Sequence, residues 1–219
     1  MIEDKTAPPA AAAFGPPARS IPSSSSVPVV VVGGLGLPWL RDMDFGTQFV
    51  RRVAGETWPE GVVVEDLSYA AHRVLHTLQD LAPTKVILVG AIPREVDPPG
   101  TVRRYRLEMA PPDDEEVHER LAEAVGGIID LDHTLAVVRY WNGFPPDTVV
   151  IEIEPGDQSF GLGFSDPVEA MVEPVLEMVR DEVAALYNGS RRQAVAGGVA
   201  GVAREGPPRA EDAEEREGP

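Results

Sequence analysis

The chain has 219 residues, 43% of them hydrophobic, so it is long enough to bury the core of one medium-sized domain. Its 19 Lys and Arg residues against 36 Asp and Glu residues give a formal net charge of −17, which argues against nucleic acids and anionic membrane surfaces as partners. The absence of cysteine excludes thiolate nucleophiles, Cys-bound metals and disulfides, and fits a reducing, cytoplasmic location. We also expect no membrane span and no secretory signal, because the longest apolar run is short and the N-terminus lacks a basic and apolar leader.

Composition divides the chain into three parts. Residues 1–26 are rich in proline and serine and are predicted to be a disordered arm. Residues 189–219 combine small residues with an acidic stretch and are predicted to be a disordered acidic tail. Residues 27–188 then form a single folded domain.

The first half of this domain alternates between strands and helices. Residues 27–32 are a continuous β-branched run ended by Gly33 and Gly34, which is typical of a strand buried on both faces. Helical spacing of apolar residues predicts a helix over residues 44–54. A strand over residues 62–64 comes next, then a helix that Ser68 can cap, and then a strand over residues 85–89.

The second half continues the alternation. Residues 101–109 are more strand-like than helical and suit an edge strand, and the prolines and acids after them begin a helix that ends near residue 125. Asp132 can cap the next helix, residues 149–153 form another strand, and Asp166 and Pro167 open a long final helix. These crossovers of helical length predict a three-layer α/β/α sandwich around a mainly parallel sheet.

Ligands of such sheets bind beyond the carboxyl ends of the strands, which selects the loops at residues 33–44, 66–69, 90–96 and 156–165. Gly34, Gly36, Asp66 and Gly90 are therefore candidate site-lining residues, although Asp66 can equally bond its own turn. Known glycine motifs fit poorly, because Trp39 stands where the dinucleotide fingerprint needs its third glycine and no Walker lysine follows. The hypothesis that the chain is a small-molecule-binding α/β module thus rests on the fold alone.

The loop sequences resemble a known family. Residues 29–46 read Val-Val-Val-Val-Gly-Gly-Leu-Gly-Leu-Pro-Trp-Leu-Arg-Asp-Met-Asp-Phe-Gly, and this pattern is similar to the opening of hydrogenase maturation proteases. Residues 63–66, 86–92, 143–155 and 163–179 resemble later strands and the last helix of that family, in the same order. The resemblance covers residues 28–187, and the last helix is its most specific part.

The resemblance implies an endopeptidase that removes the C-terminal extension from the large subunit of a nickel–iron hydrogenase once nickel has been inserted. The partner would be the large-subunit precursor, and the nickel would belong to that substrate rather than to an intrinsic cofactor. In the family, two carboxylates and a histidine at the sheet edge recognise the metal, and these ligand types suit Ni²⁺.

This chain departs from the family at its metal ligands. The second acid of the family's acidic pair falls on Met43, and the carboxylate expected after the third strand falls on Gly90. The expected histidine falls on Gly126 or Gly127. Asp42 and Asp44 keep a carboxylate on either side of Met43, so two of the three ligands, those replaced by glycine, are missing on the simplest alignment.

Nearby residues can supply a displaced ligand set of Asp42, Asp44 and His133, while the catalytic group stays unassigned. Each has a structural alternative, because the two aspartates can stabilise the start of the next helix and His133 can lie in a helical turn behind Asp132. Two functions follow: an active endopeptidase with a relocated site, or a non-catalytic relative that binds the precursor as an assembly scaffold or chaperone. Trp39 is a binding anchor if it faces solvent and a lid over the sheet edge if it does not.

Overall fold

The computed structural model describes residues 27–127 and 129–199, so the predicted arm at 1–26 and most of the predicted tail lie outside the described residues. Its sheet has the strand order β2-β1-β3-β5-β4. The first four strands in this order are parallel, and the edge strand β4 runs antiparallel to β5. The strands are β1 (Val30–Leu35), β2 (Val62–Asp66), β3 (Lys85–Ala91), β4 (Val102–Arg106) and β5 (Thr148–Ile153).

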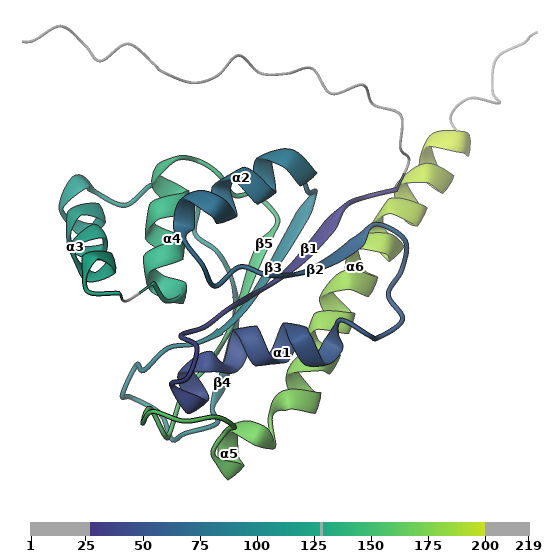
Figure 1. The fold of residues 1–219 in the computed structure, drawn as a ribbon. Helices are drawn as coiled ribbons and strands as arrows, with labels where there is room; N and C mark the ends of the chain where they lie inside the picture. Colours follow the sequence, from purple (N-terminus) through teal and green to yellow (C-terminus); the bar gives the residue numbers. More distant parts are fainter. Residues whose placement is uncertain (1–26, 128, 200–219) are drawn as a thin grey trace, which may run out of the picture.

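Helices cover both faces of the sheet, as predicted (Figure 1). One face carries α1 (Phe45–Val53) and α6 (Val172–Val199), and the other carries α2 (Ala71–Leu81) and α4 (Leu131–Tyr140). Helix α3 (Asp114–Val125) packs against α4, and two short helices, η1 (Arg41–Asp44) and α5 (Asp166–Glu169), lie in the loops. The α/β/α sandwich with a mainly parallel sheet is therefore confirmed.

Alternation along the strands divides the core into two apolar layers. Val30 and Val32 point to the layer under α1 and α6, while Val31 and Leu35 point to the layer under α2 and α4. Because β1 is buried on both faces, its sequence is continuously apolar rather than alternating.

Two glycines set the distance between α1 and the sheet. A Cβ atom on Gly34 would lie 2.1 Å from the carbonyl oxygen of Gly46, and a Cβ atom on Gly46 would lie 2.2 Å from the carbonyl oxygens of Leu35 and Val89. The start of α1 therefore rests directly on the backbone of β1 and β3, which places η1 at the carboxyl edge of the sheet.

Some predicted helix boundaries were wrong. Helix α2 starts at Ala71 and has no side-chain cap, because the Ser68 hydroxyl instead bonds the Thr47 hydroxyl. Helix α4 is capped by Asp130, whose carboxylate accepts the backbone N–H of His133 at 2.9 Å, and not by Asp132.

The predicted last helix is interrupted after Glu169 and resumes as α6. Helix α6 extends to Val199, so the boundary that we predicted at residue 188 falls inside it.

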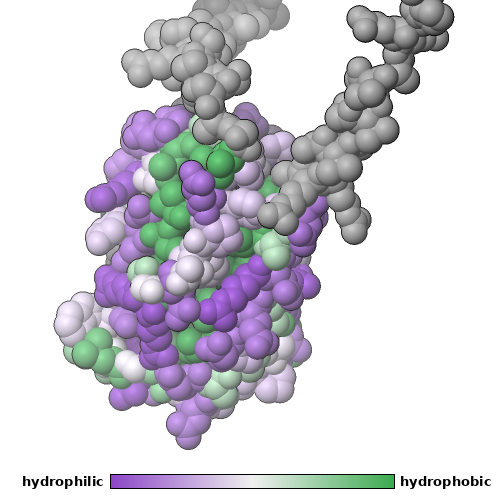
Figure 2. Space-filling view, turned by 90° about the vertical axis from the view of Figure 1, so that its right-hand side faces the viewer, coloured by the Kyte–Doolittle hydropathy of each residue, from purple (hydrophilic) through white to green (hydrophobic). Residues whose placement is uncertain are grey.

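One side of the molecule presents a predominantly hydrophilic surface (Figure 2). Figure 2 shows the side of the molecule at the right of Figure 1, where hydrophilic residues surround strips of hydrophobic ones. Across the described residues, no helix is both long enough and apolar enough to cross a membrane.

Candidate functional site

The loops after β1 and β5 are joined at the carboxyl edge of the sheet. The backbone N–H of Gly161 donates to the carbonyl of Trp39 at 2.7 Å, and the N–H of Asp42 donates to the carbonyl of Asp157 at 3.1 Å. The guanidinium of Arg41 pairs with the Asp157 carboxylate at 3.3 Å. Two of the four loops selected from the sequence therefore form one surface.

The carboxylate of Asp42 holds this junction together. It is fully buried. One oxygen accepts the backbone N–H of Ser165 at 2.7 Å, and the other accepts the N–H groups of Gly156 and Asp157 and the Ser165 hydroxyl at 2.7–2.8 Å. Through these hydrogen bonds, Asp42 fastens the loop after β1 to the loop after β5.

Trp39 faces solvent, which favours the anchor interpretation over the lid. Its indole stacks on Phe160 with ring centroids 6.4 Å apart and planes 14° apart. The backbone here is strained, since Trp39 has φ 70° and Arg41 has φ 40°. A left-handed conformation costs a non-glycine residue about 1–2 kcal/mol, so the fold retains this loop shape at an energetic expense.

Asp44 and His133 are both buried. One carboxylate oxygen of Asp44 accepts the Gln48 amide at 2.8 Å, and the other has no hydrogen-bond partner among the described residues. The Nδ1 atom of His133 lies 2.8 Å from the Arg120 carbonyl oxygen, so Nδ1 is the donor of this hydrogen bond. Within residues 27–127 and 129–199, no group of three or more His, Cys, Asp or Glu side chains is arranged to hold a metal ion. The ligand set Asp42, Asp44 and His133 stays a prediction.

The candidate site-lining residues serve packing and turn geometry. Asp66 accepts the backbone N–H of Ser68 at 3.1 Å and pairs with Arg51 at 3.0 Å, so it bonds its own turn. A Cβ atom on Gly36 would lie 3.0 Å from the backbone of η1. A Cβ atom on Gly90 would lie 2.9 Å from the Leu35 carbonyl oxygen.

The family's ligand positions are filled by apolar packing in this chain. Met43 is buried in the layer under α1 and α6. On the other face, the place of a side chain at Gly90 is occupied by Leu131, whose Cδ2 would lie 3.1 Å from the added Cβ. A carboxylate at position 90 would need Leu131 to move.

A carboxylate does lie beside Gly90, on the neighbouring strand. Glu152 is the register partner of Gly90, and both face the layer under α4. Glu152 is buried and accepts Arg94 at 2.8 and 3.1 Å and the Tyr105 hydroxyl at 2.9 Å. The same guanidinium donates to both oxygens of Asp132 at 2.8 and 3.0 Å. A fixed cation, Arg94, therefore bridges the two acidic side chains.

The charges in this network stabilise each other. Burial alone would raise the pKa of Glu152, but the hydrogen bonds from Arg94 and Tyr105 outweigh it and hold that pKa below its usual range. Burial and the charge of Glu152 raise the pKa of Tyr105. Glu152 is therefore an anion with its cation already in place.

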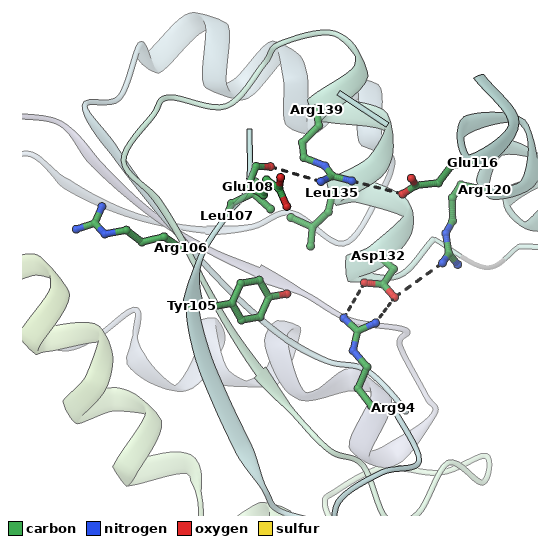
Figure 3. Close-up of a pocket in the computed structure, with 10 residues that line it drawn as sticks. All are labelled: Arg94, Tyr105, Arg106, Leu107, Glu108, Glu116, Arg120, Asp132, Leu135 and Arg139. Atoms are coloured by element: carbon green, nitrogen blue, oxygen red, sulfur yellow. Dashed lines mark hydrogen bonds and ion pairs between the residues drawn. The ribbon is translucent and has the colours of Figure 1, made fainter. Parts of the chain in front are cut away.

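Next to this network lies a cavity of about 440 Å³ between β4, α3 and α4 (Figure 3). Arg139 pairs with Glu116 at 3.4 Å across it, and Arg120 pairs with Glu123 at 2.9 Å. Because its guanidinium groups face carboxylates, charge gives the cavity no preference for an anion. Its lining residues are Arg94, Tyr105, Arg106, Leu107, Glu108, Glu116, Arg120, Asp132, Leu135 and Arg139.

Sequence reasoning missed Arg94, Glu152 and Glu154. The alternation of the two glutamates in residues 149–154 reads as a strand with one solvated face, yet both are buried. Glu154 accepts the backbone N–H groups of Arg94 and Glu95 at 3.2 and 3.0 Å. The signal that could have indicated the two glutamates is a pair of acids at the end of an apolar strand. The glycine-containing loop that follows them is part of the family resemblance.

The fold and this edge define the class of protein as an α/β/α sandwich with a binding edge built from loops. Comparison with solved structures shows which proteins of this class the chain is similar to. No protein-family model and no curated protein matches the chain. The hydrogenase maturating endopeptidase HybD from Escherichia coli is 25% identical, with 74% of this chain and 93% of that chain covered and a TM-score of 0.55. The solution structure of an endopeptidase from Escherichia coli is 24% identical, with 71% and 91% covered and a TM-score of 0.55.

The [NiFe] hydrogenase maturation protease HycI from Thermococcus kodakarensis is 15% identical, with 71% of this chain and 92% of that chain covered and a TM-score of 0.53. The resemblance seen in the sequence is therefore confirmed by HybD, while the two solved structures of lower identity show the shared fold alone.

Proposed function

We propose that this chain acts in the maturation of a nickel–iron hydrogenase by binding the precursor of the large subunit at the carboxyl edge of its sheet. The observation that carries this proposal is the fold shared with HybD over 93% of that endopeptidase. The cysteine-free composition suits the cytoplasm as the place where the chain meets its partner.

The first form of the proposal is proteolytic. Here the chain removes the C-terminal extension, and the nickel that it recognises is part of the substrate. Asp44 supports this form with a carboxylate oxygen that has no partner among the described residues. His133 supplies a ring nitrogen, Nε2, that is not the atom bonded to the Arg120 carbonyl, whereas Asp42 would have to release hydrogen bonds to the loop after β5 to join the set.

A second form, binding without cleavage, is favoured by the packing. Met43 and Leu131 occupy the ligand positions with apolar side chains, and Arg94 places a cation between Glu152 and Asp132. An entering metal ion would have to compete with a bound guanidinium. The geometry therefore supports precursor binding better than precursor cleavage.

An intact-mass assay on a mixture with the nickel-loaded precursor separates the two forms. Cleavage that is lost in Asp44→Ala or His133→Ala, but kept in the exposed control His118→Ala, supports the proteolytic form with its relocated ligands. A stable complex with unchanged precursor mass supports binding without cleavage. Absence of a complex for the wild-type chain contradicts both, provided that circular dichroism shows the chain folded.

A further inference from the structure

A pair of aromatic rings lies in solvent at the carboxyl edge. Trp39 is 55% exposed, Phe160 is 79% exposed and Leu162 is 64% exposed. We name Trp39 and Phe160, whose rings stack, the aromatic platform. They come from the loops after β1 and β5, which are far apart in the sequence.

The platform is held in place before any partner arrives. A backbone hydrogen bond from Gly161 to Trp39 joins its two loops, and the buried Asp42 carboxylate links the loop after β5 to η1. Trp39 keeps a left-handed backbone although it is not glycine. Strained positions of this kind cluster at functional sites, and a surface fixed in advance loses less entropy on binding.

The fold itself does not account for these exposed side chains. An aromatic ring contributes to stability through the area that it buries, and these rings leave most of theirs in water. Exposed apolar groups on a rigid rim are typical of protein interaction sites, where Trp is enriched among the residues that carry affinity.

The position of the platform and the net charge of the chain indicate its occupant. The first described residues and the C-terminal end of α6 lie at the opposite end of the sheet from η1 and α5 (Figure 1). A second copy is disfavoured because each chain carries a net charge of −17. The remaining occupant is a different protein that reaches the edge where the proposed site lies.

We propose that the aromatic platform docks an apolar segment of the hydrogenase large-subunit precursor, next to the edge at which the precursor is recognised. This inference rests on the proposed function. The expected segment presents aliphatic or aromatic side chains to Trp39 and Phe160, with the Arg41–Asp157 pair forming part of a polar rim.

Calorimetric titration of the full-length chain with the purified precursor tests this docking. Trp39→Ala and Phe160→Ala should each weaken binding about 10- to 30-fold, as expected for an aromatic anchor. The matched control is Trp141→Ala, because Trp141 is 61% exposed and also contacts a ring, Tyr140, at 5.6 Å, but lies at the far end of α4. The control should bind within twofold of the wild type.

The outcomes separate the two proposals. If the wild type binds and both platform variants bind equally well while keeping their melting temperature, the docking surface is wrong and the proposed function stands. If the folded wild type does not bind the precursor, the proposed function fails. If light scattering shows a wild-type dimer that Trp39→Ala dissociates, the platform is a self-association surface and the assigned occupant is wrong.

Discussion

Replacing Asp42 by alanine tests whether this residue fastens the two edge loops. The substitution removes one buried anion and all four of its hydrogen bonds, from Gly156, Asp157 and Ser165. A hydrogen bond to a charged group contributes about 1.5–3 kcal/mol, and water can replace the partner of donors near the surface. If water restores half of them, the loss is about 3–6 kcal/mol, close to that for breaking a buried charged pair.

Urea unfolding and thermal unfolding, both followed by circular dichroism, measure this loss. For a domain of this size, each 1 kcal/mol lowers the melting temperature by about 2–4 °C, so Asp42→Ala should lower it by roughly 10 °C without added metal. The control Asp80→Ala, at an exposed position of α2, should change stability by less than about 0.5 kcal/mol. An Asp42→Ala variant as stable as the wild type would refute the fastening role and leave the Asp42 carboxylate free for the proposed ligand set.

Three other substitutions test the sheet edge. Folding lowers the pKa of Glu152, so its stabilising effect is present above the unfolded carboxyl pKa near 4.3 and is lost as the pH falls through the lower folded value. In Glu152→Gln, the free energy of unfolding should therefore fall less steeply below about pH 4 than in the wild type, as measured by urea unfolding at a series of pH values. Gly46→Ala should lower the free energy of unfolding by about 3 kcal/mol or more, since its Cβ would meet two carbonyl oxygens at 2.2 Å. The control Gly55→Ala, with nothing within 4 Å of the added Cβ, should change it by less than about 0.5 kcal/mol. Equal stabilities of the two variants would contradict the close contact between α1 and the sheet. Gly90→Asp should cost about 1–3 kcal/mol, and a double-mutant cycle with Leu131→Ala should show a combined loss smaller than the sum; strict additivity would mean that the two positions do not compete for space.

The fold was predictable because each strand and helix carries its own pattern. The β-branched run of β1 and the apolar stripe of α6 define their elements without reference to the rest of the chain. Caps were less predictable. Ser68 and Asp130 show why, since a serine or aspartate near a helix start caps it only if its backbone adopts the extended conformation at the right residue, and Ser68 bonds to Thr47 instead.

The site was harder to predict because its contacts join distant segments. The register that places Glu152 beside Gly90, and the approach of Arg94 over them, depend on strand order and on a loop conformation that no local pattern contains. Asp42 illustrates the same limit. Its position after a glycine-rich strand marks it as important, but its three partner residues lie more than a hundred residues away.

The most direct test of the central claim is calorimetric titration of the purified full-length chain with the nickel-loaded large-subunit precursor, with the mass of the precursor recorded before and after. We expect saturable binding in a one-to-one complex and, from the packing at Met43, Gly90 and Arg94, an unchanged precursor mass. A folded chain that shows no binding would contradict the account, and loss of a C-terminal peptide would contradict the assignment of binding without cleavage.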